Sequence, residues 1–501
     1  MKKLWKKLLA VTTAVMMAIT LLPAMANANA TDGKGSVTII KNGEKSDEFL
    51  AGAKFSFYKI ASITNSEGKD WKYTVEEAYR EKLGDNGIAK NLNDLPSSAW
   101  EAEIDVLAAT NATAIKESEA SAEKTGSTGA TELPLGVYLV KETTTPAGYV
   151  ASKPFIVSVP STDNYDTAGK EGTEFIYNIT AKPKNSKMSV DKTIVNEDKT
   201  AYIGGFVEYK VETQIPKYGT EYTNPVFNIY DKMSNGLSFV NDAAHKLKVF
   251  VGGTEIVERE NTYTLATNGL SDEKTFEIQF AKAFLENKEN KGKKVEVTYY
   301  AQVNKNAVYI NENSANITYQ NKPGETTDAT PSEKNVYTYG IDLTKKGDKS
   351  ADADGLDGAE FTLAVANGEM ISILVNGNSK DEFRTTTVGI KKGKLVFKGL
   401  KAGTYTLTET KSPSGYSLAK NPITIVITAN EDGSLADATV DGNSVKDNMT
   451  EAGVVPVGLQ NKSGFNLPAT GGMGTYLFTI GGLVIMAGAA LLLIASRKRR
   501  A

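Results

Sequence analysis

A repeated strand motif places a glutamate on a face that should be hydrophobic. The segment GVYLVKETTTPAGY occupies residues 136–149, and GTYTLTETKSPSGY occupies residues 403–416. Successive side chains of a strand point to opposite faces, so in each copy a tyrosine, an aliphatic residue and a glutamate share one face. A buried carboxylate is costly unless it pairs with a cation or binds a proton. Glu142 and Glu409 therefore predict buried partners elsewhere in the chain.

Short strand-like runs fill the middle of the sequence. Clusters of Gly, Asn, Asp and Pro separate GSVTII, GAKFSFYKI, KPFIVSV, FVEYKVET, KKVEVTYYAQV, ANITYQN, AEFTLAV and NPITIVITA. This pattern predicts an all-β chain of tandem immunoglobulin-like β-sandwiches. The runs LAGAKF and LDGAEF precede the two glutamate motifs, which indicates that two domains are built alike.

The first of these domains is longer because it carries a helical-looking insert. TVEEAYREKLG opens with Thr74 and Glu77 at the spacing of a capping box, and SSAWEAEIDVLAATNATAIKE follows it. We expect both segments to be helical.

The two ends of the chain predict export and a membrane-bound C-terminus. Residues 1–30 combine the basic MKKLWKK, an apolar stretch too short for a comfortable span, and small residues before a cut near Ala30, as in a signal peptide. From Tyr476 to Ala495 the chain is uncharged over about twenty residues, enough for one membrane-spanning helix, and SRKRR follows.

Composition and charge exclude several classes of protein. A formal net charge of −3 without a basic stripe argues against a nucleic-acid partner. The chain has no cysteine and one histidine, His245, so a familiar nucleophile triad would need a general base that the sequence does not reveal. We therefore expect no enzyme. SADADGLDGAEF resembles a calcium loop only in part, and a turn followed by a strand explains it better. No metal or cofactor is expected.

Candidate partners for Glu409 lie near both ends of the last domain. Lys345 and Asn461 each share a strand face with two aliphatic residues. Singly, a snorkelling lysine, a salt-bridged glutamate or a hydrogen-bonded asparagine would be ordinary. Together the three residues could carry out a reaction. A desolvated lysine attacks the asparagine carboxamide, while the protonated glutamate polarises that carboxamide and relays protons. Ammonia leaves, so each bond lowers the mass by about 17 Da.

Both glutamate segments resemble the E-box of CnaB-type domains in Gram-positive pilins and adhesins, YxLxETxxPxGY. The resemblance implies an intramolecular Lys–Asn isopeptide bond in each domain, with the glutamate as its catalytic residue. The implied residues are Lys345, Glu409 and Asn461 in the last domain and Lys41, Glu142 and Asn185 in the first.

The region between these domains resembles the CnaA-like middle domain of major pilins, with aspartate replacing glutamate. Lys192, Asp231 and Asn313 share strand faces with apolar residues in SVDKTIV, FNIYDKMSNGL and NSANITYQN. The resemblance implies the same kind of bond here. Three other asparagines remain candidates for the acceptor: Asn311, Asn316 and Asn321.

The segment NLPATGG just before the apolar span resembles the cell-wall sorting signal of Gram-positive surface proteins. The motif LPxTG, the span and the basic tail follow in the expected order. The resemblance implies that a sortase cuts between Thr470 and Gly471 and holds the new Thr470 carbonyl as a thioester. A permanently membrane-anchored ectodomain is the alternative. The motif residues are Leu467, Pro468, Ala469, Thr470 and Gly471.

The segment FIYNITAKPKNSK at the end of the first domain resembles the pilin motif of backbone pilins, which usually ends in Tyr-Pro-Lys-Asn. Its alternation places Phe175 and Asn185 on the core face and Lys184 on the solvent face. Lys184 is then the implied nucleophile for the sortase. Lys182, which stands where tyrosine is usual, and a lysine-rich hinge without sortase chemistry remain alternatives.

From Thr31 to Thr470 these signals identify the chain as similar to a major, shaft-forming pilin, a cell-wall-anchored fimbrial subunit. We expect a signal peptide at 1–30, a CnaB-like domain at 31–185, a CnaA-like domain at 186–336, a CnaB-like domain at 337–465 and the sorting region at 466–501. The implied partners are pilin-specific and housekeeping sortases, further copies of the chain joined from Lys184 to Thr470, accessory tip and base pilins, peptidoglycan and a host surface ligand. A singly anchored adhesin that does not polymerise is the alternative.

Overall fold

The computed structural model describes residues 33–45, 47–66, 70–83, 104–162, 175–196, 198–352, 355–368, 370–383 and 385–464. The expected signal peptide, the LPATG motif and the apolar span lie outside these residues. No helix within the described ranges is long and apolar enough to cross a bilayer.

The chain divides into two compact units. The first comprises Met1–Glu197, Phe206–Gln302 and Glu312–Lys334, and the second comprises Asp198–Gly205, Val303–Asn311 and Asn335–Ala501. The first unit holds the expected first domain and most of the expected middle domain. The finer division into three domains remains a prediction.

The all-β prediction is confirmed, and each strand-like run quoted from the sequence forms a strand. Burial alternates with the side-chain period of two along β14 (Phe206–Gln214) and β26 (Glu360–Val365). Hydrophobic burial on the inward-facing residues therefore holds the sheets together.

Two sheets and two short strand pairs make up the N-terminal part of the first unit. One sheet has the order β11-β1-β5, with bounds Asn178–Ala181, Lys34–Ile40 and Ser127–Pro134. The other has the order β3-β2-β6-β8, with β4 paired to β2, and the bounds are Asp70–Val75, Lys54–Ser66, Gly136–Thr144, Phe155–Val159 and Lys116–Glu117. The pairs are β10-β9, Phe175–Ile176 with Ser161–Thr162, and β12-β7, Ser186–Lys187 with Tyr149–Val150.

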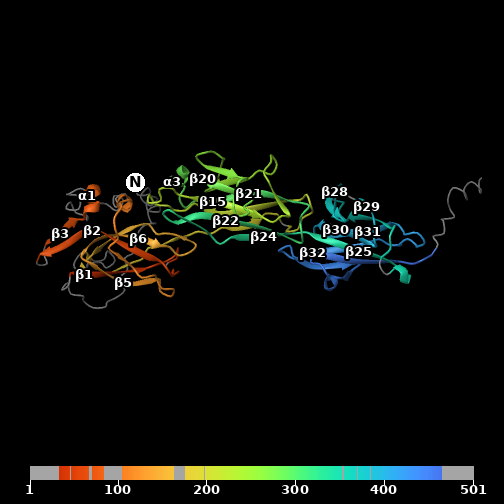
Figure 1. Ribbon diagram of the computed structural model, residues 1–501, viewed down its shortest axis with the longest axis horizontal. Helices are drawn as coiled ribbons and strands as arrows, with labels where there is room; N and C mark the ends of the chain where they lie inside the picture. Colours follow the sequence, from red (N-terminus) through yellow and green to blue (C-terminus); the bar gives the residue numbers. More distant parts are fainter. Residues whose placement is uncertain are drawn as a thin grey trace, which may run out of the picture. The chain divides into compact units, whose positions relative to one another are not determined.

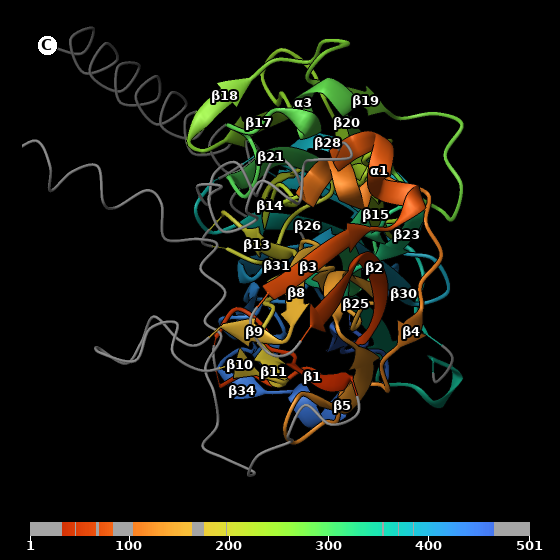
Figure 2. The same cartoon turned by 90° about the vertical axis from the view of Figure 1, so that its left-hand side faces the viewer.

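Strand β6 is buried on both faces because the insert covers its outer side. Tyr138 and Val140 belong to the core between the two sheets, whereas Val137 and Leu139 pack in a second cluster with Tyr79 of helix α1 (Glu77–Leu83). Figure 2 shows α1 beside β3.

The insert is less helical than expected. The capping-box prediction was wrong, because Thr74 pairs with Ser62 in the β2–β3 ladder and the helix begins at Glu77. In the second expected helix, residues 97–103 lie outside the described ranges and 104–108 are helical, but residues 116–117 form β4. Pairing with the long strand β2 supplies backbone hydrogen bonds that a helix would otherwise provide.

The remainder of the first unit is built around two larger sheets. One has the order β13-β14-β21-β17-β18, with β16 paired to β21, and its further bounds are Asp191–Ile194, Lys294–Val303, Lys248–Val251, Thr254–Ile256 and Leu237–Val240. The other has the order β19-β20-β15-β22-β23, with β24 paired to β22, and its bounds are Tyr263–Ala266, Phe276–Phe280, Phe227–Met233, Ile310–Lys322, Glu325–Asp328 and Ser332–Tyr337. A few residues at the ends of strands β21, β22 and β24 belong to the second unit. Helix α3 (Lys282–Glu286) follows β20.

The second unit also contains two sheets (Figure 1). One has the order β28-β27-β30-β25-β35, with bounds Asn378–Phe383, Ile371–Val375, Lys394–Leu400, Tyr339–Gly347 and Val454–Asn461. The other has the order β29-β26-β31-β32-β33-β34, whose further bounds are Thr385–Gly389, Gly403–Lys411, Ile423–Ala429, Leu435–Val440 and Asn443–Ser444. The short 3-10 helices are η2 (Ser350–Asp352) and η3 (Lys446–Asn448).

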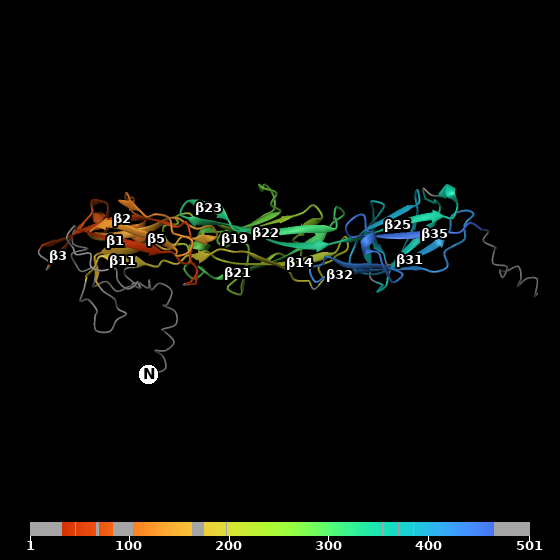
Figure 3. The same cartoon turned by 90° about the horizontal axis from the view of Figure 1, so that it is seen from below.

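The two repeated domains place their first and last strands side by side in parallel. β1 pairs with β11, and β25 pairs with β35, as Figure 3 shows for the latter pair. Residues from opposite ends of each domain sequence therefore meet on one sheet face.

Candidate functional site

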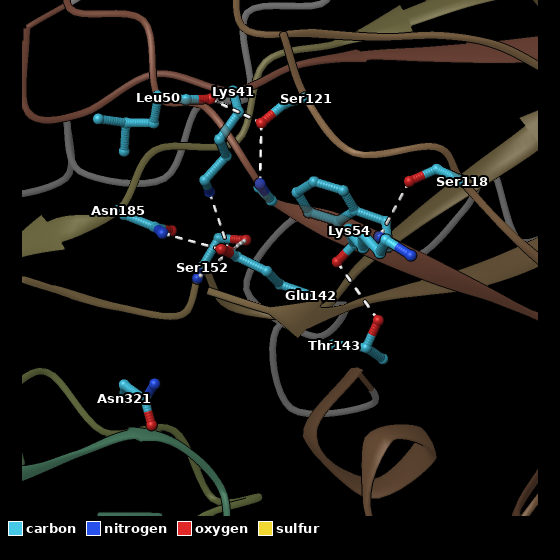
Figure 4. Close-up of polar contacts among 12 residues, drawn as sticks. Lys41, Leu50, Lys54, Ser118, Ser121, Glu142, Thr143, Ser152, Asn185 and Asn321 are labelled. Atoms are coloured by element: carbon cyan, nitrogen blue, oxygen red, sulfur yellow. Dashed lines mark hydrogen bonds and ion pairs between the residues drawn. The ribbon is translucent and has the colours of Figure 1, made fainter. Parts of the chain in front are cut away.

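The first lysine, acid and asparagine cluster (Lys41, Glu142 and Asn185) is buried between the two sheets of the N-terminal part. Lys41 follows β1, Glu142 lies on β6, and Asn185 lies between β11 and β12. The Lys41 Nζ is 3.0 Å from Glu142 Oε2, and Asn185 Nδ2 donates a hydrogen bond of 2.9 Å to Glu142 Oε1. Figure 4 shows the lysine and the asparagine converging on this carboxylate. The inward orientation predicted for all three residues is confirmed.

The backbone on both sides fixes the position of Lys41. Its N–H donates to the Gly126 carbonyl at 2.7 Å, and its carbonyl accepts from the Leu50 N–H at 3.0 Å. Gly126 has a φ of +62°, and a Cβ there would lie 2.4 Å from the Lys41 carbonyl oxygen. Only glycine meets both requirements. The lysine side chain therefore enters the core from a fixed point.

Burial weakens the hold of Lys41 on its proton. Desolvation lowers the pKa of Lys41, and the neighbouring Glu142 only partly opposes this effect. Glu142 Oε2 also accepts hydrogen bonds of 2.8 Å from both the N–H and the hydroxyl of Ser152. The amine is thus poised to become neutral beside an oriented acid.

The last cluster (Lys345, Glu409 and Asn461) repeats this geometry in the second unit. Lys345 Nζ lies 3.5 Å from Glu409 Oε1, and Asn461 Nδ2 lies 2.9 Å from both oxygens of the same carboxylate. Desolvation lowers the pKa of Lys345 against the influence of Glu409. The Ala419 N–H donates to Glu409 Oε2 at 2.8 Å, the contact that Ser152 makes in the first cluster.

Strand register brings each lysine to its asparagine with the same offset. Lys345 pairs with Leu459 in the parallel ladder, and Asn461 lies two residues farther along that strand. In the first domain Asn42 bridges to Lys184, so Lys41 and Asn185 are offset by the same two residues. Because side chains two apart share a face, each pair points into its core together.

The second repeated element, LAGAKF and LDGAEF, lies directly beside the acid. Phe55 pairs with Glu142 and Phe361 pairs with Glu409, and each register shifts at the residue before the phenylalanine. In the first domain the Lys41 ammonium lies 5.5 Å from the centre of the Phe55 ring. This repeat supplies the apolar wall against which the acid is held.

The middle cluster (Lys192, Asp231 and Asn313) also spans two sheets. Lys192 comes from β13, whereas Asp231 and Asn313 come from the neighbouring strands β15 and β22 of the other sheet. Lys192 Nζ lies 2.6 Å from Asp231 Oδ2. Burial lowers the pKa of Lys192 to about 8 and raises the pKa of Asp231, although each is opposed by the attraction within the pair.

Two tyrosines complete the middle cluster. The hydroxyl of Tyr299 donates to Asp231 Oδ2 and accepts a hydrogen bond of 3.3 Å from Asn313 Nδ2. The ring of Tyr209 stacks on that of Tyr299, and Lys192 Nζ lies 4.7 Å from the Tyr209 ring centre. Neither these tyrosines nor Ser152 was predicted from the sequence. The alternation of KKVEVTYYAQV, in which Tyr299 shares the face of Val295 and Val297, was an available signal for Tyr299.

The other asparagine candidates are engaged with the backbone. Asn311 Nδ2 donates to the carbonyls of Val308 and Val336, and Asn316 Nδ2 donates to the Ala329 carbonyl and the Tyr230 hydroxyl. The side-chain oxygens of Asn311, Asn316 and Asn321 accept backbone N–H groups. Among these candidates only Asn313 contacts the residues of the middle cluster.

The two lysines considered as nucleophiles for the sortase lie in the segment after β11 and differ in their exposure to solvent. Lys184 is exposed, Lys182 is half-buried, and Asn185 is buried. The placement of Phe175 on the core face was wrong, because this side chain is 46% exposed. Its short strand β10 pairs with β9, outside the main sheets, so the alternation starts only at β11.

Each cluster holds the components of an amide exchange. A buried amine of lowered pKa can act as a nucleophile, an adjacent acid can transfer protons, and a carboxamide offers an electrophilic carbon. In the described part of the chain, no group of three or more His, Cys, Asp or Glu side chains could hold a metal ion.

Family models match most of the chain. A prealbumin-like fold domain matches residues 35–173 and 340–442, and a Cna-B-like domain of Gram-positive pilin backbone subunit 2 matches residues 203–323. The family description of residues 203–323 is Cna-B-like, whereas the sequence of this region resembles a CnaA-like domain. The CnaA-like assignment therefore stays a prediction. An LPXTG cell wall anchor motif matches residues 460–501.

Individual pilins resemble the chain over most of its length. Fimbrial subunit type 2 of Actinomyces naeslundii is 28% identical over 495 residues, with 89% of this chain and 82% of that protein covered. The T6 backbone pilin of Streptococcus pyogenes, described as a modular three-domain structure, is 18% identical with a TM-score of 0.56, covering 87% of this chain and 99% of T6. The major pilin SpaA of Corynebacterium diphtheriae, described with stabilizing isopeptide bonds, is 20% identical with a TM-score of 0.50, covering 86% and 100%.

Tandem β-sandwiches with a cell-wall anchor motif define a Gram-positive surface protein, and the families that it matches are structural. Within that class the chain belongs to the backbone pilins, the major subunits of cell-wall-anchored fimbriae.

Proposed function

We propose that the chain is polymerised head to tail, with Lys184 of one copy joined to Thr470 of the next. A sortase would cleave between Thr470 and Gly471, hold the Thr470 acyl group as a thioester and transfer it to the Lys184 amine. The thioester bond breaks and an amide bond forms, with the lysine losing a proton. The observation that carries this proposal is the exposure of Lys184 next to the buried Asn185, in a chain whose end matches an LPXTG anchor.

We also propose that Lys41–Asn185, Lys192–Asn313 and Lys345–Asn461 form intramolecular isopeptide bonds with loss of ammonia. Burial of each lysine beside an acid supports this, as does the match of the lysine–asparagine offset between the two repeated domains. Each bond would then crosslink one of the three domains expected from the sequence. Since the chain has no cysteine, these amides would take the place of disulfides in an exported protein.

The proposed partners follow from this assembly. They are a pilin-polymerising sortase, a second sortase that attaches the finished shaft to peptidoglycan, accessory pilins at tip and base, and a host surface ligand.

An immunoblot of cell-wall extracts boiled in detergent tests polymerisation. The proposal expects a ladder of covalent multimers for the wild type and for the control variants Lys182→Ala and Lys187→Ala, whose lysines are half-buried and exposed. Lys184→Ala should leave one monomeric band. A single band for the wild type would favour the anchored adhesin, and a ladder in Lys184→Ala would assign the linkage to another lysine.

A further inference from the structure

The middle cluster differs from the other two in the contact between acid and asparagine. In the first and last clusters the asparagine Nδ2 donates directly to the glutamate, at 2.9 Å in both. Among the residues that the structure describes, no such bond joins Asn313 to Asp231. Instead, Asn313 Nδ2 donates to the Tyr299 hydroxyl, which donates to Asp231 Oδ2. A tyrosine hydroxyl thus stands between the acid and the amide.

The length of the acid explains this arrangement. Aspartate lacks one methylene of glutamate, so its carboxylate reaches about 1.5 Å less far from the strand. Asp231 uses Oδ2 for both Lys192 and Tyr299, and its Oδ1 has no hydrogen-bond partner. The hydroxyl of Tyr299 extends the reach of the shorter acid to Asn313.

Aromatic packing fixes the direction of the Tyr299 hydroxyl. Its ring stacks on Tyr209, with centroids 5.5 Å apart, and the ring of Phe276 meets it edge-on at 4.9 Å. The side chain is fully buried, and a buried tyrosine hydroxyl needs polar partners. Burial, reinforced by the charge of Asp231, raises the pKa of Tyr299, so the phenol keeps its proton and remains a donor.

We propose that Tyr299 is a catalytic residue of the middle-domain bond, passing a proton from Asp231 to the leaving nitrogen of Asn313. This role rests on the isopeptide bond proposed above. It also explains how a domain with the shorter acid can complete the same reaction as its neighbours.

The proton transfers balance without an added reactant. Lys192 first gives a proton to Asp231, and its neutral Nζ attacks Cγ of Asn313, so that an N–C bond forms and the carbonyl electron pair moves to Oδ1. Tyr299 gives its hydroxyl proton to Nδ2 and recovers one from Asp231, which takes a second proton from Nζ. The Cγ–Nδ2 bond breaks, the carbonyl re-forms and ammonia leaves, with Asp231 protonated.

The test compares the full-length wild-type chain with Tyr299→Phe, Tyr300→Phe and Lys192→Met. Phenylalanine keeps the ring packing and removes only the hydroxyl. Tyr300 is the next residue of β21, but it points to the opposite face, where its ring meets His245 edge-on at 5.1 Å. Lys192→Met cannot form the bond and serves as the folded, uncrosslinked reference. Peptide mass mapping follows the ammonia loss over time, and far-ultraviolet circular dichroism, which is dominated by the backbone, follows the fold.

We expect the wild type and Tyr300→Phe to be fully crosslinked between Lys192 and Asn313. Tyr299→Phe should form the bond at least about 100-fold more slowly, as general acid–base catalysis predicts, with the dichroism of Lys192→Met. A rate equal to that of the wild type would overturn the role of Tyr299 alone. Tyr299→Phe could also lose both the bond and the circular dichroism of the folded reference. That result would equally overturn the catalytic role, because the hydroxyl would then be needed for the fold. A wild type that retains all its ammonia would instead refute the underlying isopeptide bond.

Discussion

Lys184 and Asn185 are consecutive residues with opposite environments, since Lys184 is exposed to solvent and Asn185 is 2% exposed in the core. One strand end therefore presents an amine to an external enzyme while directing a carboxamide toward Lys41. In the proposed shaft, the bond to the next subunit starts beside the intramolecular bond of the first domain. This adjacency determines which bonds carry load.

Load should bypass the first bond and pass through the last. If force enters at Lys184 and leaves at Thr470, the chain before residue 184 lies outside the load path and bears no tension. Lys41→Ala should leave shaft rupture unchanged, whereas Lys345→Ala should release the 116 positions between Lys345 and Asn461, about 400 Å of extended chain. Pulling on single shafts measures both, and equal weakening of the two variants would contradict this load path.

Intact mass should count the bonds. The purified recombinant segment from Thr31 to Thr470 is expected to weigh about 51 Da less than its sequence, or about 17 Da for each ammonia. Glu142→Ala, Asp231→Ala and Glu409→Ala should each retain one ammonia, because each removes the acid of one cluster. Mass spectrometry corrected for the substitution checks this, and a wild type at its full sequence mass would rule out the bonds.

Asn313 and Asn311 should respond differently to removal of the carboxamide. Asn313→Ala should abolish the middle-domain bond, since its Nδ2 reaches the cluster through Tyr299. Asn311→Ala should keep that bond but lower the free energy of unfolding by about 1–3 kcal/mol, because the backbone of Val308 and the buried carbonyl of Val336 lose hydrogen bonds to the Asn311 side chain. Peptide mapping and urea denaturation distinguish the two. Loss of the bond in Asn311→Ala alone would reassign the acceptor.

An uncrosslinked middle domain should become more stable as the pH rises from about 8 to 10.5. In Asn313→Ala the Lys192 amine stays free, with a pKa near 8 when folded and an ordinary value of 10.5 when unfolded. Between these values the unfolded chain binds more protons, so the free energy of unfolding increases with pH, and below pH 8 the full penalty of the buried charge applies. The expected gain is about 1–3 kcal/mol.

The matched control for this pH dependence is the double variant Lys192→Met/Asn313→Ala, which lacks the amine. Urea denaturation at pH 7.5 and pH 10 should show the gain only in Asn313→Ala. Parallel pH profiles for the two variants would mean that Lys192 keeps its ordinary proton affinity in the core.

The strand pattern, the inward orientation of the lysines, acids and asparagines, and the outward orientation of Lys184 could all be predicted from the order of the amino acids. These are consequences of the two-residue period of a strand, which needs no knowledge of distant neighbours. The same local pattern failed at Phe175 and Thr74, where pairing with other strands decides exposure and helix start. Which asparagine lies near Asp231, and the position of Tyr299 between the two, became clear only from the folded arrangement of the sheets. Such contacts depend on register and on the facing sheet, and a one-dimensional pattern cannot specify either.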